Sequence, residues 1–435
     1  MCAKWLNNGP NPPQSIVARL ESARIKTGKQ AGELNFLTAF EVNSMLLSFV
    51  EFHPDLPECE QLPIINRAMQ AAAHRGEITA SRFMAEVCKA ENLFLGHDEA
   101  PYVIVTSLSI KYTQRLTART LCGVKISFAP VLPKRFSRDE LSRNAQDTLG
   151  ADEPTSYTWV FARTKGRSFG EASAKAMRAV ELLRGIWNFH YNRRKGMSWS
   201  FGGRQKPVNE IRRGPLHTLH HPGGRLAVEN VWWWEPDYTG PERTRDLDEG
   251  WQSFRRDEQW ILRRLTLSPF KHILSESFCR YASALDENNL QNGFLQLWSL
   301  LESLTGTQRA TYDTTVRRAA FLYDEHQFHQ QILNHLRERR NRSIHRGQSQ
   351  EDDQTLLYQM KRYCEQMMTF LLRARRFKTL EECWAFFDTP KDVVELEERI
   401  ASYKDKIALC KWSKQFRTSK PRQEADRQAS DREDG

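Results

Sequence analysis

The stretch YTWVFARTKGRSFGEASAKAMRAVELLRGIW, residues Tyr157–Trp187, decides the fold class because its hydrophobic period changes halfway along. Its first part, Tyr157–Ala162, is a run of aromatic and β-branched residues that is typical of a strand. In its second part the apolar residues recur on one face of a helix, at Ala172, Ala176, Val180, Leu183 and Trp187. A strand followed by an amphipathic helix predicts mixed α+β structure, with a sheet partly covered by helices.

Further strands are expected on either side of this stretch. β-Branched or alternating runs occur in four places: Tyr102–Val105, Val124–Phe128, Ser198–Phe201 and Leu226–Trp232. Apolar residues at helical spacing precede them in Phe36–Phe52 and Pro63–Leu95. We therefore expect residues 36–245 to form one α+β domain of unknown specificity, with a sensing or regulatory role.

The two ends of the chain are expected to be poorly ordered. Residues 1–35 are polar and interrupted by prolines, which predicts a loosely ordered N-terminal segment. Residues 411–435 carry many charges and very few apolar side chains, which predicts a disordered charged tail.

A loop rich in proline, glycine and charge, Pro236–Arg245, is the expected boundary between two domains. Every segment of residues 246–410 has helical spacing, so the fold class is α+β, with an all-α bundle in the C-terminal part. The last helix is expected to open at Thr389, as its N-cap, followed by Pro390. Its apolar residues step by three and four and form a short heptad seam: Val393, Leu396, Ile400, Tyr403, Ile407 and Cys410.

The composition favours a reduced, intracellular protein that binds a polyanion. Lys and Arg number 64 against 54 Asp and Glu, and the resulting formal charge of +10 favours nucleic acid as a partner. The eight cysteines contain no C-x-x-C pair, so reduced thiols are expected. No apolar run approaches the ~20 residues of a membrane span or resembles a signal peptide. We therefore expect a cytoplasmic protein.

The candidate chemistry lies in Gln331–Gly347, QILNHLRERRNRSIHRG. At about 100° per residue, Arg340 falls on a slowly drifting apolar stripe with Ile332, Leu336 and Ile344. A cation on an apolar face is costly unless it pairs with an acid or meets an anion. This position therefore favours an anionic ligand, although an arginine-rich helix is also commonly a solvated face or a salt-bridge ladder.

Asn341 and His345 are four residues apart and share a neighbouring face of the same helix. An arginine such as Arg340 can grip two phosphate oxygens in a fork. Histidine, with a reference pKa near 6.5, can transfer a proton near neutral pH, although a lone histidine is commonly structural. Together the three residues supply what phosphodiester cleavage needs without a metal.

The pattern Arg340-Asn341-x-x-x-His345 resembles the R-x(4–6)-H motif of the HEPN superfamily, all-helical domains that include many metal-independent ribonucleases. The order of LWSLLESLTG (Leu297–Gly306), VRRAAFLY (Val316–Tyr323) and LRERRNRSIHRG is similar to the ApeA-like branch. The resemblance covers roughly residues 250–410. Arg339 also satisfies the spacing, but Arg340 is preferred because the polar residue Asn341 follows it directly.

The resemblance implies that Arg340 binds and polarises the scissile phosphate and that Asn341 holds the phosphate or orients the histidine. His345 would transfer protons as the 2′-hydroxyl attacks, which leaves a 2′,3′-cyclic phosphate and a 5′-hydroxyl. No metal and no cofactor are expected, and the chain has no G-x-x-x-x-G-K-[ST] or G-x-G-x-x-G loop for a nucleotide cofactor.

The resemblance also implies partners. RNA would be contacted by Arg339, Arg342 and Arg346, and Glu302 could pair with a motif arginine. A homodimer with a shared active site is expected, because Arg340 and His345 are about 140° apart around an ideal helix. Such proteins serve in defence against phage or as toxins, with a phage-derived or nucleic-acid trigger.

Two alternatives stay open. The first is a non-catalytic HEPN-like module that binds nucleic acid or a partner protein. The second is a metal-dependent hydrolase built on the cluster His217, His220 and His221, although that loop contains no acidic ligand. Two further segments are weaker candidates for nucleic-acid contacts: Trp232–Trp234 for stacking on bases and Arg193–Lys195 for binding phosphate.

Overall fold

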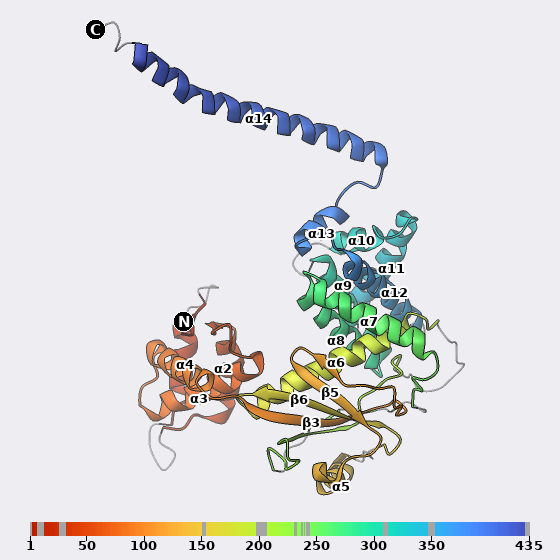
Figure 1. Cartoon of the computed structure of the whole chain (residues 1–435). Coiled ribbons are helices and arrows are strands. Elements are labelled where there is room, and N and C mark those ends of the chain that lie inside the picture. Colours follow the sequence, from red (N-terminus) through yellow and green to blue (C-terminus); the bar gives the residue numbers. More distant parts are fainter. Residues whose placement is uncertain are drawn as a thin grey trace. The chain divides into compact units, whose positions relative to one another are not determined.

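The computed structural model describes residues 2–6, 13–25, 32–149, 154–196, 207–229, 233–235, 238, 240, 244–307, 312–346 and 353–430. The chain divides into two compact units. The first comprises Met1–Leu262 with Phe278–Gly293, and the second comprises Arg263–Ser277 with Phe294–Gly435. The first unit contains a six-stranded sheet and the described part of the second is helical (Figure 1), which confirms the predicted α+β class. The expected boundary, Pro236–Arg245, falls inside the first unit.

The six-stranded sheet is antiparallel, with strand order β4-β5-β6-β3-β7-β8. Its strands are β3 (Ala100–Leu108), β4 (Arg119–Leu121), β5 (Val124–Ala129), β6 (Thr158–Gly166), β7 (Leu216–His220) and β8 (Trp233–Trp234). The central pair, β3 and β6, is in a register that places Ala100 opposite Gly166 and Leu108 opposite Thr158. Both central strands are rich in β-branched and aromatic residues because the sheet is covered on both faces.

Three predicted strands are confirmed, since Tyr102–Val105, Val124–Phe128 and Tyr157–Ala162 fall within or largely overlap β3, β5 and β6. The strand expected at Leu226–Trp232 is wrong for residues 226–229. There the chain makes only a single bridge to β7, between Leu226 and His220, and residues 227–229 form no strand. Residues 198–201 lie outside the described part of the chain.

One face of the sheet is covered by α6 (Phe169–Asn192), as Figure 1 shows. Ser168 caps the helix by accepting from the backbone N–H of Glu171 at 2.9 Å, and the Glu171 carboxylate accepts from the backbone N–H of Arg167 at 2.6 Å. The helix lies close to β6, because a Cβ at Gly166 would meet the backbone nitrogen of Ala172 at 2.8 Å. All five residues predicted to face the core are fully buried: Ala172, Ala176, Val180, Leu183 and Trp187.

The other face of the sheet is covered by the segment around a short 3-10 helix, η1 (Lys134–Phe136), which α5 (Asp139–Leu149) follows. Phe136 is 1% exposed and packs on Val103 and Val105 of β3 and on Phe161 of β6. Since β3 contributes core residues to both faces, its sequence reads as a continuous apolar run rather than an alternating one.

Four helices precede the sheet: α1 (Pro13–Ser22), α2 (Phe36–Leu47), α3 (Glu58–His74) and α4 (Ala80–Leu95). They build a core of their own, in which Ile16, Val17 and Leu20 of α1 are buried. The expectation of a loosely ordered segment over residues 1–35 is therefore wrong for α1, because its apolar residues share one helical face. The stretch Pro63–Leu95 is two helices, which are separated at Gly76, where φ is +111°.

The N-terminal strand β1 (Lys4–Trp5) pairs with β2 (Val50–Glu51). Beside it, Cys2 and Cys88 form a disulfide, with their Cα atoms 5.5 Å apart. The expectation of reduced thiols is wrong for this pair. Its two cysteines are 86 residues apart, so no local spacing in the sequence could reveal the bond.

Beyond the sheet the described chain is helical. The helices are α7 (Trp251–Leu267), α8 (Lys271–Asp286), α9 (Leu290–Thr305), α10 (Tyr312–Ala320), α11 (His326–Arg346), α12 (Asp353–Arg373), α13 (Leu380–Phe387) and α14 (Val393–Ser430). In α12 one broad apolar face is buried, formed by Leu356, Leu357, Met360, Tyr363, Cys364, Met367, Met368 and Leu371. Within the described residues, no helix is long and apolar enough to cross a membrane.

The last helix, α14, begins later and ends later than expected. Asp392 caps it by accepting from the backbone N–H groups of Val394 and Glu395, at 2.7 and 3.1 Å, so Thr389 is not its N-cap. The helix continues to Ser430, which corrects the prediction of disorder from residue 411. Glu, Lys, Arg, Gln and Ala are good helix formers, and they dominate this charged segment.

Candidate functional site

The arginine-rich stretch predicted to hold the chemistry forms the C-terminal half of α11. Its core-facing side is set by Leu333 and Leu336, which are fully buried. Arg340 follows Leu333 by seven residues, and seven residues are close to two full turns of a helix, so both side chains leave it in nearly the same direction. The side chain of Arg340 is half-buried. Ile332, which was expected on the same apolar stripe, is also half-buried and is not part of the core. The helix thus carries a cation on its core-facing side.

Arg340 and Asn341 contact each other directly. The Nη1 of Arg340 donates to the Oδ1 of Asn341 at 3.2 Å. This bond uses the acceptor end of the amide, so the remaining polar groups of the pair are N–H donors. A phosphate or another oxyanion presents only acceptors, and it is the complementary ligand for such a pair.

The neighbouring arginines differ in their surroundings. Arg337 forms an ion pair with Asp313 of α10. Arg342 is exposed and lies 3.7 Å from Glu338, one turn earlier, which is a weak surface pair. Arg339, the alternative motif arginine, is half-buried and lies about 90° around the helix from the Leu333/Leu336 side. The core-facing position therefore belongs to Arg340.

The structure describes the backbone of α11 through Arg346, but the side chains of residues 343–346 lie outside its described part. The predicted roles of His345 and Arg346 consequently rest on their places along the helix. His345 lies one turn beyond Asn341, and about 140° around the helix axis from Arg340.

Glu302 of α9 was a weak candidate for pairing with a motif arginine. Its Oε1 accepts a hydrogen bond from the indole Nε1 of Trp298, one turn earlier, at 2.7 Å. Trp298 is 1% exposed, so the bond satisfies a buried donor. Among the described contacts Glu302 has no arginine partner, and its role is structural.

The histidine cluster of β7 is a set of polar groups on two faces of the sheet. His217 and His220 are three residues apart on a strand, so their side chains point to opposite faces. His217 contacts Thr106 and Glu235, whereas His220 contacts Thr218 and the carbonyl oxygen of Gly224. These two histidines therefore cannot bind one metal ion together, and among the described residues no three His, Cys, Asp or Glu side chains gather around this cluster, so the structure gives no support to a metal-dependent hydrolase built on it.

The contacts of His217 were not predicted from the sequence. Its Nδ1 lies 2.7 Å from the hydroxyl of Thr106, and its Nε2 lies 2.8 Å from the carboxylate of Glu235. Burial lowers the pKa of His217, so the ring is neutral at pH 7. Burial opposes the ionisation of Glu235, but the bond from His217 and the charge of Arg213 outweigh it and lower its pKa to about 2.

This Thr-His-Glu arrangement has the order of a catalytic triad, but its hydroxyl cannot meet a substrate. Thr106 is fully buried and His217 is 3% exposed. On the other face, Arg138 donates to the carbonyl oxygens of Val105 and Leu216, and burial lowers its pKa to about 9. The contact between Thr106 and His217 on one face and the hydrogen bonds of Arg138 on the other both link β3 to β7, so these residues have a structural role.

The structure also describes parts of the two segments that were weaker candidates for nucleic-acid contacts. Arg193 and Arg194 both lie within 3.2 Å of Asp257, and Lys195 lies 3.4 Å from Glu210, so these cations are paired within the protein. Of the tryptophan run, Trp234 is 47% exposed at the edge of the sheet. Trp232 lies outside the described residues.

A cluster formed by α11, the segment before it and α12 was not predicted, because Tyr363 of α12 is far in sequence from the other two members. The ring of His329 stacks on Tyr323, and its Nδ1 lies 2.9 Å from the hydroxyl of Tyr363. Burial lowers the pKa of His329 and raises that of Tyr363 to about 12. His329 is eleven residues from Arg340, about 16 Å along the helix, so the two cannot serve one phosphate.

Comparison with known proteins gives no independent assignment. No family model, curated protein or solved structure matches the chain. Among the described residues, no three His, Cys, Asp or Glu side chains gather where they could hold a metal ion. The candidate site therefore rests on the arrangement of α11 itself.

Proposed function

We propose that the C-terminal part of the chain is a metal-independent endoribonuclease of HEPN type. The observation that carries the proposal is the contact between Asn341 and Arg340, the cation on the core-facing side of an arginine-rich helix. A half-buried guanidinium whose neighbour supplies further N–H donors is suited to hold one phosphate of an RNA chain.

The reaction needs one fixed cation and one group that moves protons. Arg340 binds the scissile phosphate and stabilises the extra negative charge of the pentacovalent transition state. Asn341 orients the guanidinium through its Oδ1. His345 takes the proton of the 2′-hydroxyl as its oxygen attacks phosphorus, and a proton returns to the leaving 5′-oxygen. The P–O5′ bond breaks, giving a 2′,3′-cyclic phosphate and a 5′-hydroxyl.

The flanking arginines extend the site along the RNA backbone. Arg339, Arg342 and Arg346 bind neighbouring phosphates, which gives affinity without base specificity. RNA binding should therefore weaken steeply as the salt concentration rises.

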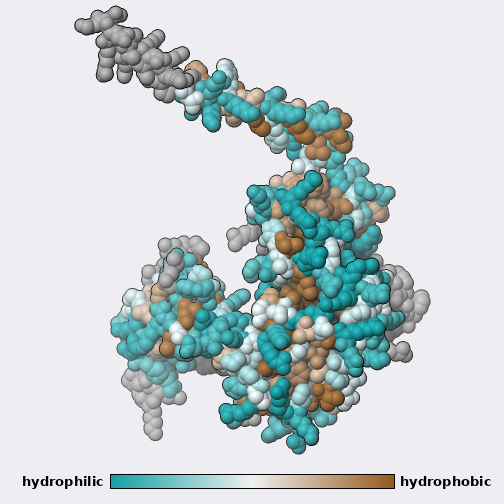
Figure 2. All heavy atoms as spheres, in the orientation of Figure 1, coloured by the Kyte–Doolittle hydropathy of each residue, from teal (hydrophilic) through white to brown (hydrophobic). Residues whose placement is uncertain are grey.

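The working unit in this proposal is a homodimer. Because Arg340 and His345 lie about 140° apart around α11, a two-fold axis near Asn341 brings Arg340 of one protomer towards His345 of its partner. A second surface for pairing is α14, whose described side chains are nearly all exposed and include a row of apolar residues (Figure 2).

The shared site can be tested by mixing wild-type protein with an Arg340→Ala/His345→Ala double variant. At equal amounts and random pairing, about a quarter of the dimers are wholly wild type, and activity per wild-type chain falls to about half. Unchanged activity after verified subunit exchange contradicts a shared site.

In the cell, we propose that the nuclease acts in the cytoplasm, in defence against phage or as a toxin. The α+β part then acts as the sensor of a phage-derived or nucleic-acid trigger. Its buried groups Thr106, His217 and Arg138 make contacts that hold the sheet together, which favours a binding role over a catalytic one.

The deciding experiment is RNA cleavage by the full chain in the presence of EDTA. Arg340→Ala and His345→Ala should each abolish cleavage, whereas Arg375→Ala removes an exposed arginine beyond α12 and serves as the charge-matched control. Cleavage that needs an added metal, or that survives His345→Ala, contradicts the mechanism. RNA binding without any cleavage supports the alternative, a non-catalytic module.

A further inference from the structure

Three positively charged side chains share one face of the six-stranded sheet. Cross-strand partners point to the same face, and the register pairs Lys125 of β5 with Arg163 of β6. Lys165 lies two residues after Arg163 on β6, so it points to that face as well. The Cα atoms of Lys125 and Arg163 are about 5 Å apart, and those of Arg163 and Lys165 about 7 Å apart. These three residues make up the basic patch.

The basic patch lies on a part of this face that η1 does not cover. Phe136 of η1 packs on Phe161, which precedes Arg163 by two residues on the same face of β6. Beyond that contact the face opens, since Lys125 and Lys165 are exposed and Arg163 is half-buried. A ligand can therefore reach all three cations.

The charge of the basic patch is not neutralised by the described part of the protein. The Nη1 of Arg163 donates to the hydroxyl of Ser127 at 2.7 Å, which is an uncharged partner. Among the described contacts, Lys125, Arg163 and Lys165 have no carboxylate partner. The patch thus keeps three positive charges.

Neighbouring cations of the same unit show the contrast. Arg167, just after β6, and Lys175 of α6 both pair with Glu99, at 4.0 and 3.4 Å. Lys175 also pairs with Glu171 at 2.6 Å. The acid that precedes β3 is therefore engaged by cations outside the basic patch.

The register of Lys125 and Arg163 costs stability in the free protein. Opposite charges on directly paired residues stabilise a sheet, whereas like charges there repel each other. An anion bound between the two cations removes this repulsion and forms charge-assisted hydrogen bonds with both. The arrangement is therefore suited to a protein that binds a negatively charged ligand on this face.

The spread of the charges favours a nucleic-acid strand as that ligand. The basic patch extends over two strands and about 8 Å, which suits the regularly repeated phosphates of a backbone. Thr120 of β4, the cross-strand partner of Lys125, is exposed beside the patch, and threonine hydroxyls commonly contact phosphates. A lipid surface is bound through apolar side chains beside the cations, whereas this neighbour is polar.

We propose that the basic patch binds the sugar–phosphate backbone of a nucleic acid. Lys125 and Lys165 contact phosphates of the strand, and Arg163, oriented by Ser127, binds the phosphate between them. This deepens the proposed function, because it gives the sensing part of the chain a surface for a nucleic-acid trigger, and the role as a trigger site rests on that proposal. Binding itself is measured without cleavage.

The test is the binding of a fluorescent oligouridylate of about 20 nucleotides, longer than a typical single-strand site, to the full chain. An Arg340→Ala background weakens binding at α11 and prevents cleavage of the probe by the proposed mechanism. In this parent chain the dissociation constant should be below about 10⁻⁴ M at about 0.05 M salt. Lys125→Glu should weaken binding about tenfold or more, because it removes one phosphate contact and repels the backbone.

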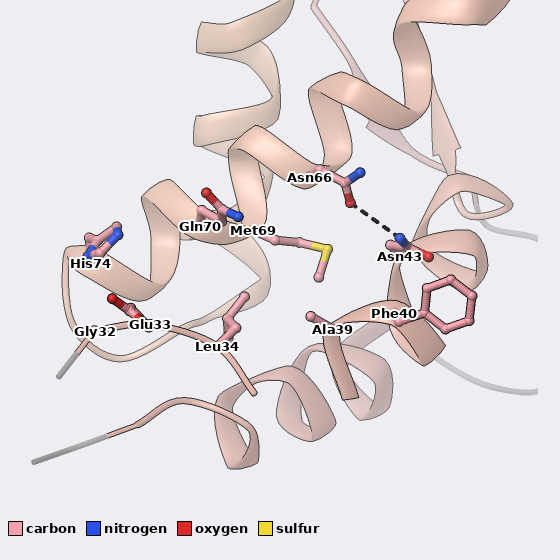
Figure 3. Close-up of a pocket in the computed structure, with 10 residues that line it drawn as sticks. All are labelled: Gly32, Glu33, Leu34, Ala39, Phe40, Asn43, Asn66, Met69, Gln70 and His74. Atoms are coloured by element: carbon pink, nitrogen blue, oxygen red, sulfur yellow. Dashed lines mark hydrogen bonds between the residues drawn. The ribbon is translucent and has the colours of Figure 1, made fainter. Parts of the chain in front are cut away.

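A second variant counts the phosphates. Lys165→Gln should reduce the slope of log K against the logarithm of the salt concentration by about 0.7, the value for one phosphate of a single strand. The matched control is Gln70→Glu, which lowers the net charge by one, as Lys165→Gln does. Gln70 is an exposed residue of α3 beside the hollow drawn in Figure 3, on a helix rather than on the sheet. Gln70→Glu should bind the probe like the parent chain.

Lys125→Glu also carries its own control for folding. It places an opposite charge beside Arg163, so the melting temperature of the full chain should rise by about 1–3 °C. A lower melting temperature contradicts the repulsion between Lys125 and Arg163.

The binding results decide the proposal. It is overturned if the parent chain does not bind the probe, if Lys125→Glu and Lys165→Gln bind like the parent, or if Gln70→Glu weakens binding as much as Lys165→Gln. Vesicles of phosphatidylglycerol that bind where the oligouridylate does not would also overturn it. If only the proposed nuclease fails, the wild-type chain cleaves no RNA, but binding still depends on Lys125.

Discussion

His217 of β7 donates a hydrogen bond from its Nε2 to the carboxylate of Glu235, at 2.8 Å. Glu235 directly follows the edge strand β8. The Thr106 hydroxyl donates to the other ring nitrogen at 2.7 Å, and these two partners fix the neutral tautomer with its proton on Nε2. Arg213 forms a second pair with Glu235, at 2.9 Å. The carboxylate of Glu235 is thus required in its ionised form and the imidazole of His217 in its neutral form.

This arrangement predicts that the first unit loses stability on acidification. Burial lowers the pKa of His217 in the folded protein below the value near 6.5 that histidine has in the unfolded chain. The contacts of the neutral ring therefore stabilise the fold above about pH 6.5, and this stabilisation is lost as the pH falls below it. The pKa of Glu235 is lowered to about 2, so its contribution, roughly 3 kcal/mol, is present above about pH 4.5 and is lost between there and pH 2. Urea unfolding at a series of pH values measures how the free energy of unfolding changes with pH.

Glu235→Gln tests the assignment. It should lower the free energy of unfolding at pH 7 by about 1–3 kcal/mol, because it weakens the contacts with buried His217 and partly exposed Arg213, and should flatten the pH dependence below pH 4.5. Glu249→Gln is the matched control, since Glu249 is 76% exposed and pairs with Arg245 at 3.5 Å. Equal pH slopes in wild type and Glu235→Gln would show that other groups control the acid response.

The strand–helix unit of β6 and α6 was predictable because its period changes within one continuous stretch, and each half has its own core face. The contact between Thr106 and His217 was not predictable, since it depends on the register between β3 and β7. That register places Val105 opposite Thr218, and over 100 residues separate the two strands. A single sequence reports periodicity along a segment, but it contains no measure of which strand pairs with which.

A second prediction distinguishes Arg339 from Arg340 by kinetics. Arg340 shares the core-facing side of α11 with Leu333, so Arg340→Ala should lower kcat of RNA cleavage by about 10²-fold or more, because it removes stabilisation of the transition state. Arg339→Ala should raise KM only a few-fold, since a flanking phosphate contact contributes equally to substrate and transition state. A loss of kcat in Arg339→Ala with normal kcat in Arg340→Ala reverses the assignment.

A third prediction concerns where the chain can be cut. Phe278 and Tyr281 of α8 are fully buried and pack edge-to-face on Phe189 of α6, and a Cβ at Gly185 would meet the carbonyl oxygen of Phe278 at 2.4 Å. A fragment of residues 246–412 removes α6 and exposes both rings. We expect it to bind a hydrophobic dye and to unfold without a sharp transition, whereas the full chain unfolds cooperatively.

A fragment of residues 246–412 that unfolds as sharply as the full chain contradicts this expectation. The expected boundary at Pro236–Arg245 followed from composition, which detects a polar loop. The packing of Gly185 against Phe278 involves residues 93 positions apart, and composition contains no signal for it. For the same reason the helices of the C-terminal part were predictable one by one, but their neighbours were not.

The arginine-rich helix of the candidate site was predictable because it is local. Helical spacing placed Arg340 on an apolar stripe with Ile332 and Leu336; the structure keeps Leu336 on the buried side and has Leu333 there in place of Ile332. The direction of a side chain around a single helix follows from a rotation of about 100° per residue. Whether Arg340 and His345 meet at one phosphate depends on a second helix or a second chain, which helical spacing does not specify.

The last prediction is that the seam of α14 holds two protomers together. Its apolar residues are exposed in one chain: Val393 by 66%, Ile400 by 50%, Tyr403 by 55% and Ile407 by 55%. A row of this period buries its side chains when a second helix packs along it. Ile407→Lys places a charge in the seam and should shift the protein towards monomer in sedimentation velocity. Leu409→Lys is the matched control.

Leu409 is 61% exposed and lies two residues after Ile407, which is just over half a turn of the helix, so its replacement adds the same charge on the opposite face. It should leave self-association unchanged.

The residues beside the seam are mostly basic: Arg399, Lys404, Lys406 and Lys411. Because salt screens their mutual repulsion, association should strengthen between about 0.05 and 0.5 M salt. Equal loss of dimer in both lysine variants, or a dimer that weakens with salt, contradicts pairing through this seam, since neither result follows from an apolar contact flanked by like charges.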